Sequence, residues 1–123
     1  MTNGPVEVMK VLVVDDDEGI RTTLNDIFKK KGYLVTTVGT GKEGLECVKK
    51  QPFHFAVLDI RLPDMSGHDL LKEIRKINFK INCIMITAFS EEADEDSLGN
   101  GAVAHLMKPL RIEDLIKIFE RKK

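Results

Sequence analysis

Five short apolar segments alternate along the chain with longer stretches in which apolar residues recur at helical spacing. This alternation restricts the fold more than any other feature of the sequence. The short segments are rich in β-branched residues and several are apolar at nearly every position, which is typical of strands buried on both faces of a parallel sheet. They span residues 11–14, 34–38, 55–58, 81–86 and 103–107.

The stretches between these segments each carry one apolar stripe of helical period. Gly32 ends the first stretch and Pro52 closes the second, whereas Ser66–Gly67 begins the third and Pro109 precedes the last. The stretch from Ser90 to Asn100 has the weakest pattern, because it holds five acidic residues and few apolar ones. We therefore expect a helix there that is short or mobile.

Strands that alternate with helices predict an α/β fold with a doubly wound, five-stranded parallel sheet, because parallel strands need right-handed crossovers that place helices on both faces. We expect the flavodoxin-like (βα)5 strand order 2-1-3-4-5, in which ligands bind beyond the carboxyl ends of the first and third strands. A length of 123 residues, 42% of them hydrophobic, suits one compact domain over residues 1–123. Residues 1–7 are expected to form a flexible N-terminal extension.

Polar residues stand where the predicted strands end. Asp15–Asp17 follow the first strand, Asp59 the third, Thr87 the fourth and Lys108–Pro109 the fifth. Each has an ordinary explanation alone, since acids cap helices and lysines are usually solvated. Together they would meet at one edge of the sheet and form a site for phosphoryl transfer.

The chemistry of such a site follows from its charges. Clustered carboxylates repel one another, and a hard cation such as Mg²⁺ or Mn²⁺ would relieve that repulsion. Asp59 could then act as a nucleophile and form an acyl phosphate. Lys108 and Thr87 would pair with the charge on the phosphoryl oxygens.

The segments 11–16, 58–67, 86–88 and 108–109 resemble the motif set of response-regulator receiver domains of two-component systems, and the resemblance covers nearly the whole chain. It is similar above all to single-domain phosphorelay or stand-alone receivers. The resemblance also implies a cis peptide bond between Lys108 and Pro109. It implies that the metal is held by Asp15, Asp16, Asp59 and the backbone carbonyl of Arg61, that Asp59 accepts the phosphoryl group, that Thr87 is the switch hydroxyl and that Lys108 pairs with phosphate.

The same resemblance implies a signalling module and not an enzyme with a separate substrate. Its phosphoryl donor would be a sensor histidine kinase or a histidine phosphotransfer domain, and phosphorylation would drive a conformational switch and a dimer. Gly19, Ile20, Pro109 and Leu110 would form an apolar patch that docks the histidine-bearing partner. Alternatively, Ile20 and Leu110 simply pack inward.

His105 departs from the family pattern, which usually has Tyr or Phe at this position. Its imidazole either replaces the aromatic ring in the conformational switch or titrates near neutrality and tunes the output. The two interpretations remain open.

Composition excludes several classes of protein. Nineteen basic and twenty acidic residues give a net charge of -1, so no global field attracts nucleic acid or an anionic membrane. Apolar segments are too short to span a bilayer and no signal-peptide block stands at the start, which predicts a cytoplasmic protein. Cys47 and Cys83 lack C-x-x-C spacing and are expected to be buried thiols.

Other functions fit the sequence less well. A haloacid-dehalogenase-like phosphatase needs an acid two residues after its nucleophile, where this chain has Arg61. An FMN carrier needs a glycine- and hydroxyl-rich first loop, whereas Asp15–Glu18 would repel phosphate. A receiver that only binds partners would not need the complete acid set. A stand-alone receiver and a receiver fragment of a transcriptional regulator or hybrid kinase both remain open.

Overall fold

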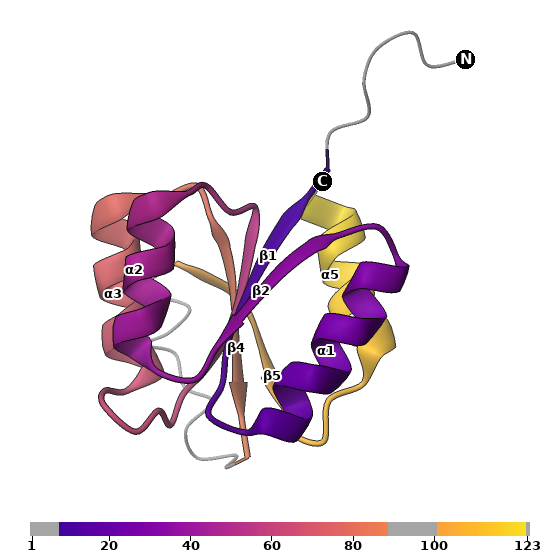
Figure 1. Cartoon of the computed structure of the whole chain (residues 1–123), viewed down its shortest axis with the longest axis horizontal. Helices are drawn as coiled ribbons and strands as arrows, with labels where there is room; N and C mark the ends of the chain where they lie inside the picture. The colour runs from indigo at the N-terminus through magenta and orange to yellow at the C-terminus, as the bar shows by residue number, and fades with distance from the viewer. Residues whose placement is uncertain (1–7, 89–100, 123) are drawn as a thin grey trace, which may run out of the picture.

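The computed structural model describes residues 8–88 and 101–122 and contains a parallel sheet with helices on both faces (Figure 1). Its five strands lie in the order β2-β1-β3-β4-β5, and every neighbouring pair is parallel. The predicted fold class and strand order are therefore confirmed. The strands are β1 (Lys10–Val14), β2 (Leu34–Val38), β3 (Phe55–Asp59), β4 (Asn82–Thr87) and β5 (Ala102–Met107).

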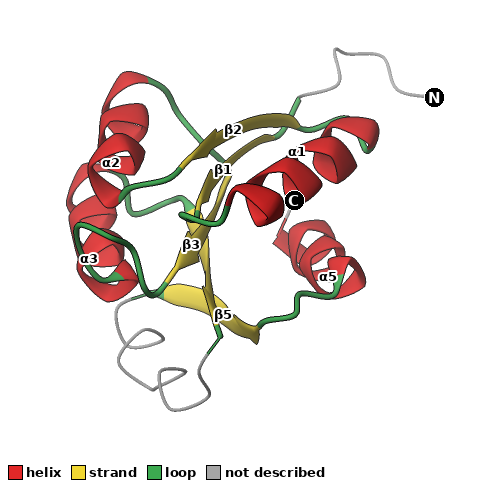
Figure 2. Ribbon diagram, turned by 60° about the horizontal axis from the view of Figure 1, so that its bottom comes forward, coloured by secondary structure: helices red, strands yellow, loops and turns green. Residues whose placement is uncertain are grey.

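Helices cover the two faces in pairs, α1 with α5 on one side and α2 with α3 on the other (Figure 2). Asp17, Thr40 and Ser66 cap the starts of α1, α2 and α3, each with a side-chain oxygen that accepts a backbone N–H. Gly32 follows α1 with a φ of 93°, a conformation that suits glycine. The helices are α1 (Glu18–Lys30), α2 (Gly41–Lys50), α3 (Gly67–Ile77) and α5 (Ile112–Lys122).

Two predictions fall on segments that cannot be compared with the structure. The flexible extension expected at residues 1–7 and the helix expected at residues 90–100 lie outside the described residues. Within the described part of the chain, no helix is both long enough and apolar enough to cross a membrane.

The sheet has a separate apolar core on each face. On the side of α1 and α5, Phe55 stacks on Phe119 with ring centroids 4.2 Å apart, and Phe28 packs beside them. On the side of α2 and α3, Leu58 and Met85 join Leu70, Leu71 and Ile74 of α3. Since the central strands are buried on both faces, they hold the residues at their ends on a rigid platform.

The two cysteines differ in burial. Cys83 is fully buried in the core, as predicted, and burial raises the pKa of its thiol to about 11. The prediction was wrong for Cys47, which is only half-buried because α2 presents it at the margin of its apolar stripe.

The carboxyl ends of the strands meet at one edge of the sheet, the lower edge in Figure 1. Val14 pairs with Leu58 across β1 and β3, and Thr87 pairs with Met107 across β4 and β5. The residues that follow these strands are therefore neighbours. We call this edge, with the loops beyond it, the carboxyl pole.

Candidate functional site

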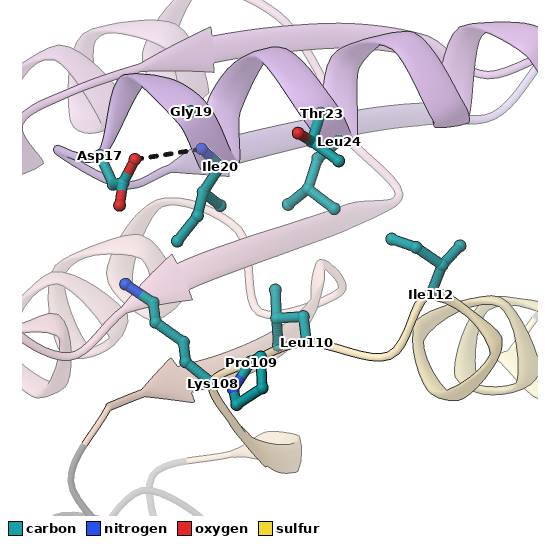
Figure 3. A pocket seen from close by; sticks show the side chains of 9 residues that line it. All are labelled: Asp17, Gly19, Ile20, Thr23, Leu24, Lys108, Pro109, Leu110 and Ile112. Atoms are coloured by element: carbon teal, nitrogen blue, oxygen red, sulfur yellow. Dashed lines mark hydrogen bonds between the residues drawn. The ribbon is translucent and has the colours of Figure 1, made fainter.

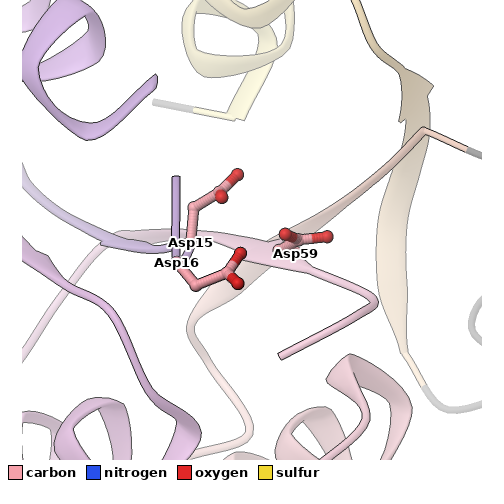
Figure 4. A group of neighbouring side chains, drawn as sticks. All are labelled: Asp15, Asp16 and Asp59. Atoms are coloured by element: carbon pink, nitrogen blue, oxygen red, sulfur yellow. The ribbon is translucent and has the colours of Figure 1, made fainter. Parts of the chain in front are cut away.

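Three carboxylates meet at the carboxyl pole (Figure 4). Asp15 and Asp16 follow β1, Asp59 ends the neighbouring β3, and each offers an oxygen within 4.8 Å of the others. Asp15 is fully buried and Asp59 is 5% exposed, whereas Asp16 is exposed. The cluster is thus closed on the side of the sheet and open to solvent at Asp16, and we call it the acidic pocket.

Backbone groups fix one oxygen of each buried carboxylate. The N–H of Asp17 donates to Asp15 Oδ1 at 2.9 Å, and the N–H of Arg61 donates to Asp59 Oδ1 at 3.1 Å. Arg21 reaches back from α1 and donates to the backbone carbonyl of Asp15 at 2.7 Å. These contacts hold the loops after β1 and β3 and leave the Oδ2 atoms for the pocket.

Lys108 bridges the two buried carboxylates. Its Nζ lies 3.1 Å from Asp15 Oδ2 and 3.3 Å from Asp59 Oδ2, and it donates a hydrogen bond to the latter. Burial on its own would lower the pKa of Lys108, but the charges of Asp15 and Asp59 raise it above the usual value. Lys108 therefore remains an ammonium group at neutral pH.

One ammonium does not balance the charge of the acidic pocket. The pKa of Asp59 is raised to about 6, first by burial and then by the charge of Asp15. The Arg61 N–H and Lys108 oppose this rise only in part. The buried Asp15 Oδ2 has to share the same ammonium group, 3.1 Å away, with Asp59.

These observations fit a divalent cation. The ligands available from Asp15, Asp16 and Asp59 are all oxygens, which hard cations such as Mg²⁺ prefer. A cation would add a second positive charge beside Asp15 and Asp59, which share the single ammonium of Lys108, and would favour the ionised form of Asp59. The donor set and the charge of the pocket thus suit the predicted kind of metal.

Thr87 and Arg61 border the acidic pocket. Thr87 is 1% exposed and ends β4, and its backbone carbonyl accepts the N–H of Lys108 at 2.8 Å. The peptide bond between Lys108 and Pro109 is cis, as predicted. Arg61 reaches the pocket through its backbone N–H, while the metal-binding role of its carbonyl stays a prediction.

The four residues predicted to dock a partner line a single cavity beside the acidic pocket (Figure 3). This docking cavity, of about 450 Å³, brings together Gly19 and Ile20 of α1 with Pro109 and Leu110. Lys108 belongs to its wall, so the cavity and the pocket are adjacent. Ile20 and Leu110 are half-buried and pack against the core as well as lining the cavity, while docking of a partner there stays a prediction.

His105 lies on β5 opposite Met85, on the face of the sheet that α3 covers. Its ring centroid is 6.3 Å from that of His68 in α3, and the two planes differ by 30°. Sequence reasoning missed this pair, because the two residues belong to different elements and stand at no recognisable spacing. The predicted role of His105 in a switch remains untested.

Asp64 is a second residue that sequence reasoning missed. Its carboxylate accepts the N–H groups of Gly41 and Lys42, each at 2.9 Å, at the start of α2. These two backbone hydrogen bonds hold the pKa of Asp64 below its usual value. The loop after β3, which follows Asp59, is thereby tied to α2.

Comparison with known proteins gives a consistent result. The model of the response regulator receiver domain family matches residues 11–120. Sporulation initiation phosphotransferase F of Bacillus subtilis (strain 168) is 36% identical over 107 residues, which are 86% of each chain. Transcriptional regulatory protein ZraR of Escherichia coli (strain K12) is 36% identical over 112 residues, which cover 90% of this chain and only 25% of ZraR.

Solved structures resemble the fold over almost its whole length. A CheY-like response regulator receiver domain protein from Methanospirillum hungatei JF-1 has a TM-score of 0.89 and 36% identity, with 94% of each chain covered. The chemotaxis response regulator CheY4 of Vibrio cholerae has a TM-score of 0.86 and 29% identity, with 95% of this chain and all of that one covered.

Proposed function

Because this chain belongs to the response regulator receiver domain family, we propose that it accepts a phosphoryl group on Asp59 from a phosphohistidine donor. The observation that carries this proposal is the position of Asp59 Oδ2, which shares a buried pocket with Asp15 and Lys108. A bond would form between Asp59 and phosphorus as the phosphorus–nitrogen bond of the donor breaks and its electron pair returns to the imidazole.

The residues around Asp59 would each have a distinct role in this transfer. Lys108, an ammonium already placed within 3.3 Å of Asp59, would pair with the phosphoryl oxygens. Thr87 would donate its hydroxyl to the same group and so transmit the modified state to β4 and β5. With His105 on the adjacent strand, this would form the conformational switch.

The metal site of the proposal consists of Asp15, Asp16, Asp59 and the backbone carbonyl of Arg61. Bound Mg²⁺ or Mn²⁺ would neutralise charge on the carboxylates and on the phosphoryl oxygens. The shortage of positive charge supports this assignment, because the buried carboxylates of Asp15 and Asp59 share the single ammonium of Lys108.

The proposed partner is a sensor histidine kinase or a histidine phosphotransfer domain. The docking cavity supports this choice, because its apolar wall adjoins the acidic pocket at Lys108. Gly19 would let a partner helix approach α1 closely, while Ile20 and Leu110 would contact its apolar side chains.

The proposal also covers how the domain passes on its signal and where in the cell it acts. The chain spans most of the B. subtilis phosphotransferase but about a quarter of ZraR, so its output would pass either to a separate protein or to an attached domain. Free thiols at Cys47 and Cys83 support a cytoplasmic location. We propose no substrate beyond its own aspartate, and the dimer expected on phosphorylation stays a prediction.

Chemical trapping tests the central assignment. The protein is incubated with acetyl phosphate and Mg²⁺, reduced with borohydride to convert an aspartyl phosphate into homoserine, and mapped by peptide mass spectrometry. We expect the conversion at position 59 and a need for the divalent cation. Conversion at another aspartate, or none in intact folded protein, would overturn the proposal.

A further inference from the structure

Charge is segregated between the two ends of the molecule. The described helices run opposite to the strands, so their first turns lie at the carboxyl pole and their last turns at the other end, the upper edge in Figure 1. Each of the four has at least one acidic residue in its first turn and two basic residues in its last turn. The net charge of -1 therefore conceals a basic end, which we call the basic pole.

The basic pole also exposes most of the large apolar side chains found on the surface of the described residues. Leu34 is 55% exposed, Ile77 41%, Phe79 75% and Val8 46%, and only Met107 lies at the opposite end. Basic residues in the last turn of a helix interact favourably with the helix dipole, and this accounts for the lysines at the helix ends. The dipole does not account for exposed apolar side chains, which are unfavourable in water and mark contact surfaces when they gather.

Two neighbouring hollows are bordered by three of these side chains, Val8, Leu34 and Ile77, and Phe79 lies two residues beyond Ile77. One, of about 750 Å³, is bordered by Leu34, Lys10 and Lys29, and the other, of about 310 Å³, by Ile77, Lys49 and Lys50. Gln51 belongs to both, so the two hollows form one surface. Each combines an apolar side chain with lysines.

Several of the lysines are available to a partner. Lys76 pairs with Glu73 at 2.9 Å, but Lys49, Lys50 and Lys80 form no ion pair within residues 8–88 and 101–122. A ligand that complements this surface needs negative charge for the lysines and apolar side chains for the hollows.

We propose that the basic pole binds an acidic segment of a partner protein through its lysines and seats apolar side chains of that segment beside Leu34, Ile77 and Phe79. Separate hollows suit individual side chains better than they suit a planar bilayer. This surface lies at the opposite end from the acidic pocket and the docking cavity, so its partner can be bound while a phosphoryl donor is docked. The inference thus goes beyond the proposed function.

Binding of a synthetic peptide to the full chain tests this proposal. The probe alternates Asp and Glu with Leu and Phe, and amide chemical shifts are followed by NMR. We expect saturable shifts in residues 29–34, 49–52 and 77–80. Lys49→Glu combined with Lys50→Glu, and separately Phe79→Ser, should each weaken binding by roughly tenfold, since each removes a charge pair or a buried apolar contact.

Matched controls separate a defined surface from general attraction. Lys42→Glu reverses an exposed charge in the first turn of the same helix, at the carboxyl pole, and should leave the affinity unchanged. A peptide with Ser in place of Leu and Phe should bind at least several-fold more weakly. Each variant should still accept a phosphoryl group from acetyl phosphate, which shows that it is folded.

Four results would overturn the proposal. These are the absence of saturable shifts, an equal loss of affinity in Lys42→Glu, equal binding of the Ser peptide, and tighter binding to phosphatidylglycerol vesicles or to a single-stranded oligonucleotide than to the acidic peptide. None of them bears on phosphorylation of Asp59, so the two proposals can fail separately.

Discussion

Asp59 ends β3 and Asp64 lies in the loop that follows it, yet their environments are opposite. Asp59 is buried beside Asp15, and its pKa is raised to about 6. Asp64 is exposed and accepts two backbone N–H groups, and its pKa is lowered. The fold satisfies the charge of one carboxylate and leaves the other under-compensated.

The difference shows how a buried, incompletely balanced charge is held in place. An under-compensated buried charge destabilises its surroundings unless the loop that carries it is held by other contacts. Asp64 ties this loop to α2, and Gly67 packs against the start of the loop so closely that a Cβ there would collide with the backbone carbonyl oxygen of Asp59. The hydrogen bonds of Asp64 and the close packing of Gly67 therefore hold Asp59 in position for phosphoryl transfer.

The largest expected effect is on phosphorylation, which should require Asp59 and not Asp64. Asp59→Asn should abolish phosphorylation by acetyl phosphate, because an amide cannot form the acyl phosphate. Asp64→Asn should retain a rate within about threefold of the wild type, since Asp64 lies outside the acidic pocket. Mass spectrometry of the intact protein over time measures both, and equal losses in the two variants would remove the distinction.

The next effect concerns the packing that supports the loop. Gly67→Ala should lower the free energy of unfolding by about 3 kcal/mol, because the added methyl group must displace backbone. Gly19→Ala is the comparison within α1: its methyl group would approach a side-chain oxygen of Asp17 and no backbone atom, so stability should change by less than about 1 kcal/mol. Urea denaturation gives both values, and an unchanged midpoint for Gly67→Ala would contradict this close packing.

The pH dependence of stability tests the charge of Asp59 directly. Because the folded pKa of about 6 lies above the usual value of 3.8, the folded state binds the proton more tightly, and stability falls as pH rises between these values. In EDTA, Asp59→Asn should be more stable than wild type by about 1–2 kcal/mol above pH 7, with the difference fading towards pH 4. A difference that is constant with pH would show that burial of charge is not its cause.

The smallest expected effect is the contribution of Asp64 to stability, which should rise with pH, whereas the contribution of Asp59 falls. The lowered pKa of Asp64 means that its contribution to stability is present at neutral pH and is lost as pH falls through the folded pKa. Asp64→Asn should cost about 0.5–1 kcal/mol at pH 7, because the amide keeps one acceptor oxygen and loses the negative charge at the start of α2, and less in acid. Denaturant unfolding at several pH values measures this, and a variant more stable than wild type at pH 7 would contradict it.

Local pattern predicted much of the fold and the acidic pocket. Segments such as residues 11–14 and 55–58 are apolar throughout because both faces of those strands are buried, and this pattern indicated the parallel sheet. Parallel strands end at one edge, so the strand order placed Asp15 and Asp59 on neighbouring strands. Lys108 follows β5, which β4 separates from β3, and its long side chain brings Nζ to both carboxylates.

Contacts between elements could not be read from local pattern. Asp64 caps a helix that begins 23 residues before it, and His68 meets His105 across α3 and β5. Summed charge likewise hid the basic pole, since it depends on the direction of each helix. Cys47 was misplaced because helical period gives the centre of an apolar stripe more reliably than its margin.

The central claim is that Asp59 shares a cation-holding pocket with Asp15 and Asp16, and Mg²⁺ titration by isothermal calorimetry tests it most directly. We predict that wild type and Asp64→Asn bind one Mg²⁺ with similar affinity, whereas Asp16→Asn and Asp59→Asn bind it at least about tenfold more weakly. Equal affinity in all four proteins would contradict the claim.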